Sequence, residues 1–204
     1  LVTLDRRTLA EGLAEAAKHA AIRDASMLHE LKGLGPELSI GFSLDTIARL
    51  PDLIARNVAI KARIVEHDEL ETQGIRALLN FGHTFGHAIE THMGYGVWLH
   101  GEAVAAGTVM ALEMSQRLGW ISAQERDRGI RLFQRAGLPV MPPQEMSEAD
   151  FLEHMAIDKK VIDGRLRLVL LRRMGEAVVT DDYPKEILQA TLGADYRALA
   201  QLKG

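Results

Sequence analysis

Residues 102–118 read EAVAAGTVMALEMSQRL and are apolar on almost every side of a helix. A helix without a polar face lies in the centre of a protein rather than on its surface. Gly119 follows directly, and glycine is the residue most often found just beyond a helix end. The segment therefore predicts a buried central helix around which the rest of the chain packs.

Two helices are expected on the N-terminal side of this segment. The first has an apolar stripe at the spacing i, i+4, i+7 and i+11, formed by Leu9, Leu13, Ala16 and Ala20. A second stripe, formed by Ile54, Val58 and Val65, predicts another helix. Proline is favoured in the first turn of a helix, so Pro51 is expected near the start of this second helix.

Three further helices are expected on the C-terminal side, because start and stop signals mark their ends. Ser122 with Glu125 starts the first of these helices, and Gly137 before Pro139 ends it. Ser147 with Asp150 starts the second, and Pro184 starts the third, which continues to Leu192. Serine three residues before an acidic residue is typical of a capping box. Glycine followed by proline ends a helix.

Residues 165–180 have a different pattern. Leu166, Leu168 and Leu170 alternate with other residues, and Met174 with Gly175 forms a turn before a second apolar run. This pattern predicts one β-hairpin. No βαβ unit is present, and no G-x-G-x-x-G motif follows a strand. The sequence therefore predicts a mostly α fold, a single multi-helix domain over residues 1–204 with a small β-hairpin.

Composition excludes several classes of protein. The 204 residues contain no cysteine, which excludes disulfides, thiol catalysis and cysteine-based metal sites. The net charge is −4, so nucleic-acid binding is not expected. The most apolar stretch, residues 103–112, is too short to span a membrane. Any metal must be held by histidine, aspartate or glutamate. The chain starts with Leu1, which indicates either processing or a piece of something longer.

The densest group of polar residues lies in residues 76–90, which read RALLNFGHTFGHAIE. On a helix His83 and His87 share one face, which Glu90 joins at i+7. Two histidines at this spacing can bind one metal ion, although they can also be ordinary core or surface residues. A glycine inside a helix costs about 1 kcal/mol relative to alanine. Gly82 and Gly86 therefore indicate close approach of another backbone or of a ligand.

His100 stands at the start of the predicted central helix, between glycine-rich turns. It can be a third metal ligand, or else His100 or Glu102 can simply cap the helix. Glu15 and Lys18 lie opposite the first apolar stripe, where an exposed ion pair is expected.

Lys61 falls on the second apolar stripe. Its ammonium can reach solvent or point into a polar cleft that binds an anion. Residues 67–69 and 158–160 are charged runs, for which a solvated surface is expected. Lys159 or Lys160 could nevertheless reach a phosphate.

These residues fall into motifs of a known family. Residues 79–90, 94–96 and 99–104 closely resemble the signature of the 3-dehydroquinate synthases. The resemblance extends to residues 12–15 with Lys18, to Lys61 ahead of residues 68–69, and to residues 158–171. It covers essentially the whole chain in the same order. Residues 16–19 depart from the usual pattern, in which a bulky apolar pair precedes the lysine and an aromatic residue follows it.

The resemblance implies a lyase of the shikimate pathway that makes precursors of chorismate and the aromatic amino acids. Such an enzyme converts 3-deoxy-D-arabino-heptulosonate 7-phosphate to 3-dehydroquinate and phosphate. The steps are transient oxidation by NAD, phosphate elimination, reduction and intramolecular aldol closure. The family enzyme is a cytoplasmic homodimer whose N-terminal α/β domain binds NAD. This chain resembles the C-terminal domain, which lacks the NAD domain and would be inactive alone.

The resemblance also assigns the site. The zinc ligands would be Glu15, His83 and His100, and Co²⁺ could replace zinc in such a set. His87 would then be a substrate contact rather than a second ligand. The other substrate-binding positions would be Lys18, Lys61, Arg76, Asn80 and Lys160, with Lys159 as the alternative to Lys160.

Two other functions deserve comparison. A related sugar-phosphate cyclase would tend to have other residues at positions 80 and 87, whereas this chain has Asn80 and His87. A metal-dependent glycerol or alcohol dehydrogenase with a similar helical domain would lack the phosphate-directed residues Lys61, Arg76 and Asn80. The main interpretation therefore remains a 3-dehydroquinate synthase acting on a small sugar phosphate.

Overall fold

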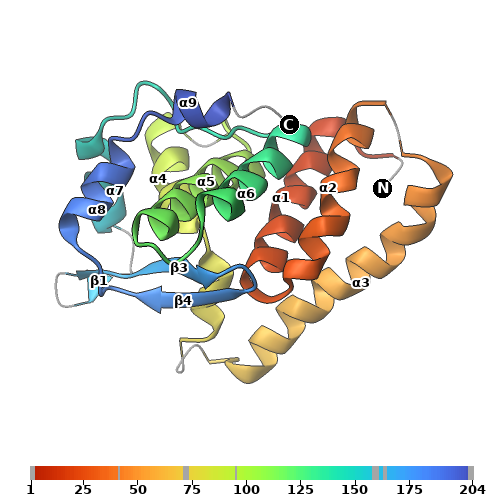
Figure 1. Ribbon diagram of the computed structural model, residues 1–204, viewed down its shortest axis with the longest axis horizontal. Helices are drawn as coiled ribbons and strands as arrows, with labels where there is room; N and C mark the ends of the chain where they lie inside the picture. Colours follow the sequence, from red (N-terminus) through yellow and green to blue (C-terminus); the bar gives the residue numbers. More distant parts are fainter. Residues whose placement is uncertain are drawn as a thin grey trace.

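The computed structural model describes residues 3–40, 42–70, 74–94, 96–157, 161–162 and 165–201. The central helix is α5, His100–Arg117, and nearly all its residues from Gly101 to Ser115 are buried. It lies in the middle of the left-hand part of the molecule, with other helices and a hairpin around it (Figure 1). Gly119 has a left-handed backbone with φ of 73°. The prediction of a buried helix followed by glycine is confirmed.

Other helices lie around α5, and those with a start signal in the sequence begin close to it, but the helix Ala25–Ile40 was not predicted. The helices around α5 are α1 Arg6–Arg23, α2 Ala25–Ile40, α4 His83–Met93, α6 Ala123–Arg135, α7 Glu148–Ile157, α8 Lys185–Leu192 and α9 Tyr196–Ala200. Ser122 and Glu125 form the predicted capping box of α6. Ser147 and Asp150 make the matching pair of hydrogen bonds before α7. Helix α8 was expected to be the last, but α9 follows it. None of the helices in the described ranges is both long and apolar enough to cross a membrane.

Helix α3, Leu44–His67, corrects one prediction. It starts at the Ser43 cap, so Pro51 lies inside the helix rather than near its start. The expected apolar stripe is not buried, because Ile54 and Val58 are 44% and 59% exposed. Helix α3 runs along the outer edge of the molecule (Figure 1) and packs against α1 and the 3₁₀ helix η1, Arg76–Asn80. Its buried residues are Thr46, Leu53 and Ile64.

The predicted hairpin is present. Strand β3, Leu168–Arg173, pairs antiparallel with β4, Glu176–Thr180, through a turn at Gly175. The predicted alternation is wrong for residues 168–171, which are all buried, because β3 also packs against α5 and η1. A second short pair, β1 Val161–Ile162 with β2 Arg165–Leu166, was not predicted.

Glycines allow α4 and α5 to cross at very short range. A Cβ atom at Gly86 would lie 3.1 Å from the backbone oxygen of Ala103, and one at Gly107 would lie 2.2 Å from that of Gly82. Gly82 precedes α4 with φ of 77° rather than lying inside a helix. Of the two reasons considered for Gly82 and Gly86, close approach of another backbone is confirmed. With the helices crossed in this way, the ring centroids of His83 and His100 lie 5.2 Å apart.

Candidate metal and substrate site

Three helices place possible metal ligands at one point. Glu15 comes from the middle of α1, His83 is the first residue of α4, and His100 is the first residue of α5. One ligand atom from each of the three residues lies within 4.8 Å of the others. The structure therefore brings together the three residues that the family resemblance assigned to zinc.

His83 is held with one ring nitrogen free to bind a metal. Its Nδ1 lies 3.2 Å from the backbone oxygen of Phe81, so Nδ1 carries the proton and donates it to that oxygen. Its Nε2 faces Glu15, 3.8 Å from Oε1. Burial and the nearby Lys18 ammonium lower the pKa of His83 to about 3. The imidazole is thus neutral at neutral pH, which is the form that binds metals.

His100 is oriented by a carboxylate on α4. Its Nδ1 lies 3.2 Å from Oε1 of Glu90, and the side chain is 47% exposed. A carboxylate that accepts the other N–H of a histidine is a common second partner in metal sites, because it fixes the ring and raises its basicity. Glu90 therefore directs the second nitrogen of His100 towards the site.

Glu15 has one oxygen engaged and one free. Oε2 accepts a hydrogen bond from Lys18 Nζ at 2.7 Å. Oε1 is buried and has no hydrogen-bond partner among the described residues. Burial opposes ionisation of Glu15, but the Lys18 ammonium outweighs it and the pKa is lowered. A buried, ionised oxygen without a donor is a costly arrangement that a cation would relieve.

Lys18 is buried, although a position on the surface was expected. Its side chain is only 3% exposed, so the ion pair with Glu15 is not on a solvated face. Burial lowers the pKa of Lys18, while Glu15 opposes that shift and the charge of Lys61 adds to it. Helix α1 packs against both α2 and α5, which leaves little of its surface exposed.

The donor set suits a catalytic metal. Two imidazole nitrogens and one carboxylate oxygen match the three protein ligands that catalytic zinc uses while keeping a position open for substrate or water. His87 belongs instead to a second group, with Glu90 and His100. Neither of the two groups found among the described residues contains both His83 and His87, so the geometry does not favour the i, i+4 pairing as the metal site.

Two of the other predicted site residues lie in the segment that leads into α4. Arg76 and Asn80 are the first and last residues of η1, which leads directly to Gly82 and α4. The Arg76 backbone N–H donates to Asp68 at 3.1 Å, and the guanidinium donates to the oxygen of Glu69 at 3.0 Å. Asp68 is buried, which corrects the expectation of a solvated charge run.

Lys61 is exposed on α3, and its charge lowers the pKa of both Lys18 and His19. Its ammonium therefore adds to the positive potential beside the site. Lys159 and Lys160 lie outside the described residues.

One feature near the site was missed, and another was weighed in advance. His19 is buried and its Nδ1 donates to Oδ1 of Asn57 at 2.7 Å, a link between α1 and α3. Glu102 accepts from the Leu99 N–H at 2.9 Å and pairs with Arg7, so the capping role weighed for Glu102 is confirmed. The position of His19 directly after Lys18 could have drawn attention to it, but no sequence pattern links it to Asn57.

Comparison with known proteins agrees with this geometry. Residues 12–161 match the family model described as 3-dehydroquinate synthase C-terminal. The chain belongs to the 3-dehydroquinate synthase family. It is 74% identical over its whole length to the 3-dehydroquinate synthase of Pseudomonas fluorescens strain SBW25, and 67% identical over 99% of its length to that of Pseudomonas entomophila strain L48. It spans 54% of the length of each of these 3-dehydroquinate synthases.

Solved structures extend the likeness beyond 3-dehydroquinate synthase itself. A 2-epi-5-epi-valiolone synthase from Streptomyces hygroscopicus, with NAD⁺ and Zn²⁺ bound, superposes with a TM-score of 0.80 at 27% identity. The match covers 98% of this chain and 53% of that one. A 2-deoxy-scyllo-inosose synthase with carbaglucose-6-phosphate, NAD⁺ and Co²⁺ has a TM-score of 0.70 at 19% identity, over 92% of this chain and 51% of that one, which shows a shared fold.

Proposed function

We propose that residues 1–204 form the metal- and substrate-binding domain of a 3-dehydroquinate synthase. The full-length enzyme would convert 3-deoxy-D-arabino-heptulosonate 7-phosphate to 3-dehydroquinate and phosphate. The observation that carries this proposal is the meeting of Glu15, His83 and His100, with a buried Glu15 oxygen that has no other partner among the described residues. The 74% identity to a protein of that name supports it. An NAD-binding domain would supply the remaining length of the relatives.

The metal would be Zn²⁺, with Co²⁺ as a possible substitute, because the structural relatives contain one or the other. When bound, the ion would polarise oxygens of the substrate and hold its hydroxyl groups in place. Glu15, His83 and His100 would be its ligands. Phe81 and Glu90 would keep the two imidazoles oriented through their Nδ1 atoms.

The substrate carries a phosphate dianion, and this domain offers cations around the metal ligands. Lys18 is buried beside Glu15, and Lys61 adds its charge from α3. We assign Lys61, Arg76, Asn80 and one of Lys159 and Lys160 to the phosphate, and Lys18 and His87 to hydroxyl and carboxylate groups. Charge complementarity of this kind favours an anionic substrate over a neutral polyol.

When bound, NAD would supply reversible oxidation of a substrate hydroxyl group to a ketone. The ketone would make the proton on the adjacent carbon acidic until the substrate is reduced again. The residues of this chain would hold the substrate while those steps occur and keep its phosphate in place until it leaves. The isolated domain would therefore not turn over substrate. A homodimeric, cytoplasmic full-length enzyme is part of the same proposal and rests on the family resemblance.

A related sugar-phosphate cyclase is the second candidate, because the valiolone synthase shares this fold at a TM-score of 0.80. Asn80 and His87 favour the first candidate, since both are the residues expected of a dehydroquinate synthase. The much higher identity to 3-dehydroquinate synthases points the same way.

The test is turnover by the full-length protein. The purified enzyme is expected to release phosphate and form 3-dehydroquinate only when NAD and zinc are both present. Activity should disappear after removal of metal with a chelator and return with added zinc. Full activity after exhaustive chelation would contradict the metal role. Conversion of a different sugar phosphate in preference to the heptulosonate would favour the second candidate.

A further inference from the structure

Helix α3 carries Lys61 but is weakly embedded in the domain. It packs against α1 and η1, and its outward side leaves Ile54 and Val58 exposed. Figure 1 shows it running along the outer edge of the molecule, beyond α1 and α2. A helix with few buried residues depends strongly on its individual contacts for its exact position. The polar contacts between α3 and its neighbours therefore help to determine the position of the Lys61 ammonium.

One of these links starts from a buried histidine beside Lys18. His19 is 4% exposed, and its Nδ1 donates to Oδ1 of Asn57 at 2.7 Å. His19 directly follows Lys18, whose ammonium binds Glu15. Asn57 lies one helical turn before Lys61, so the two side chains share a face of α3. The hydrogen bond thus joins the helix that holds Lys18 and Glu15 to the turn of α3 next to Lys61.

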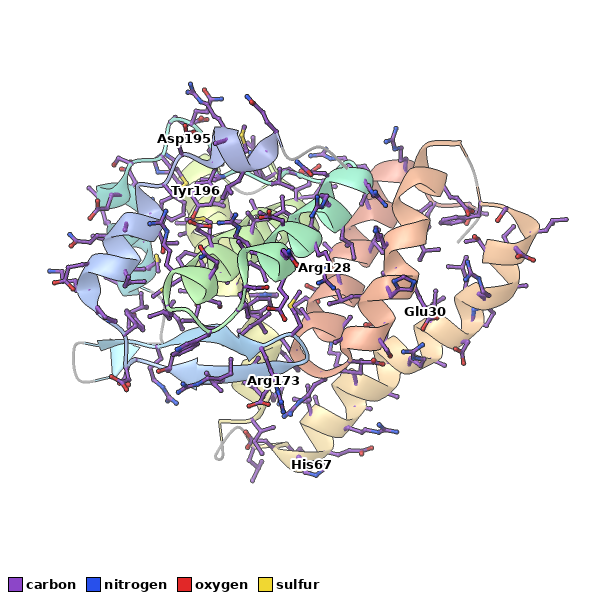
Figure 2. The ribbon with its side chains drawn as sticks, in the orientation of Figure 1. Glu30, His67, Arg128, Arg173, Asp195 and Tyr196 are labelled. Atoms are coloured by element: carbon purple, nitrogen blue, oxygen red, sulfur yellow. The ribbon has the colours of Figure 1, made fainter. Side chains whose placement is uncertain are left out.

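The adjacent residue ties the same turn to another part of the domain. Arg56 pairs with Asp24 at 2.7 Å and also with Glu30, which lies on the side of α2 that faces α3 (Figure 2). These charged groups are about one-third exposed, so solvent weakens their attraction. The hydrogen bond from His19, whose donor residue is buried, is the less screened of the two links and the nearer to Lys18.

We propose that His19 and Asn57 form a positioning pair that places Lys61 for contact with the anionic group of the substrate. Neither His19 nor Asn57 is one of the three proposed metal ligands. It sets the distance between α1 and α3, so that the ammonium groups of Lys18 and Lys61 face the same anion. This proposal rests on the proposed function for the role of Lys61 but predicts a coupling that can be measured without turnover.

A purely structural role makes a different prediction. If the hydrogen bond only stabilised the fold, its loss would lower stability and leave anion affinity unchanged. If it acts through Lys61, loss of Asn57 should weaken anion binding only while Lys61 is present. A double-mutant cycle separates these cases, because residues that act through one another have non-additive effects.

The experiment uses the full-length zinc-loaded protein, with inorganic phosphate as the probe and calorimetry as the readout. Asn57→Ala and Lys61→Ala are each expected to weaken phosphate binding several-fold. Asn57→Ala should add less than a twofold effect in a Lys61→Ala background. Val58→Ala, on the exposed side of the same helix, is the matched control and should leave affinity unchanged. Zinc content should be equal in all five proteins, which are the wild type, the two single variants, the double variant and the control.

His19→Phe provides a second route to the same result. It keeps a ring of similar size but removes the donor, so it should reproduce the effect of Asn57→Ala if the hydrogen bond is responsible. Equal effects of Asn57→Ala with and without Lys61 would overturn the proposal, as would unchanged phosphate affinity in folded Asn57→Ala and His19→Phe proteins. Failure of the wild-type protein to act on the heptulosonate would contradict the proposed function alone, because the phosphate cycle does not depend on turnover.

Discussion

Gly107 on α5 passes so close to Gly82 at the start of α4 that a Cβ atom on Gly107 would lie 2.2 Å from the Gly82 oxygen. No real side chain tolerates that separation, so the two helices can cross in this way only if residue 107 is glycine. The crossing in turn places His83 and His100, the first residues of α4 and α5, at one site. The metal-ligand geometry therefore depends on a packing contact one to two turns away from His100.

Gly107→Ala is expected to lower the free energy of unfolding by about 1–3 kcal/mol, the usual cost of overpacking a core. Zinc affinity should fall with it, because α4 and α5 must move apart. Gly33→Ala on α2 is the matched control, since a Cβ there meets nothing within 4 Å. That change should raise stability by about 0.5–1 kcal/mol. Urea unfolding measures both, and equal stabilities for the two variants would contradict the packing argument.

His83→Ala and His87→Ala should differ in their effect on zinc. His83 faces the unpartnered oxygen of Glu15, whereas His87 groups with Glu90 and His100. His83→Ala is therefore expected to abolish stoichiometric zinc, while His87→Ala keeps zinc but loses turnover of the full-length enzyme. Metal analysis and activity assays check this together. Loss of zinc in both variants would restore the i, i+4 pairing of His83 with His87 as the metal site, whereas loss in the His87 variant alone would favour the group of His87, Glu90 and His100.

Buried and exposed ion pairs should contribute differently to stability. Glu113 is 5% exposed at its side chain and accepts from Arg117 and Arg126, each at 2.8 Å. Glu113→Ala removes this buried acceptor from both guanidinium groups, of which Arg126 keeps its pair with Asp127, and should cost about 3 kcal/mol.

The comparison is Arg173→Ala at the end of the hairpin, an exposed position that Figure 2 labels. Its pair with Glu176 is largely solvated, with side chains 77% and 46% exposed. Loss of such a pair should cost at most about 1 kcal/mol. Thermal unfolding ranks the variants, and a similar loss in both would show that burial of the Glu113 pairs is not decisive.

The free energy of unfolding should fall at alkaline pH, because burial raises the pKa of two tyrosines in the folded protein. The Tyr183 hydroxyl donates to the oxygen of Leu166 at 2.6 Å, and burial raises its pKa to about 12. Burial also raises the pKa of Tyr196, whose hydroxyl donates to the oxygen of Thr191. Above pH 10 the unfolded chain loses these protons while the folded chain keeps them. Unfolding therefore becomes more favourable as pH rises from 10 towards 12.

Each tyrosine contributes a slope of up to about 1.4 kcal/mol per pH unit in that window. Tyr183→Phe should lower stability at neutral pH by removing one hydrogen bond, but it should make the alkaline decline shallower. Unfolding free energies measured from pH 8 to pH 11.5 test both effects. An unchanged slope in Tyr183→Phe would show that this hydroxyl does not titrate as the structure implies.

The sequence by itself determined the local features of the fold. The Ser122 and Glu125 cap, the glycine after α5 and the hairpin turn at Gly175 depend on residues a few positions apart, so local pattern is enough to find them. The family motifs likewise identified Glu15, His83 and His100, which the structure brings together.

Only the tertiary structure decided which residues are buried and which distant residues meet. The spacing of Ile54 and Val58 indicated a buried stripe, yet α3 lies at the edge of the domain and leaves both exposed. Lys18 was expected on the surface but is enclosed between helices beside Glu15. Burial and long-range contacts depend on how whole helices pack, here on the α4–α5 glycine crossing and the His19–Asn57 link, and the periodicity of one helix does not contain that information.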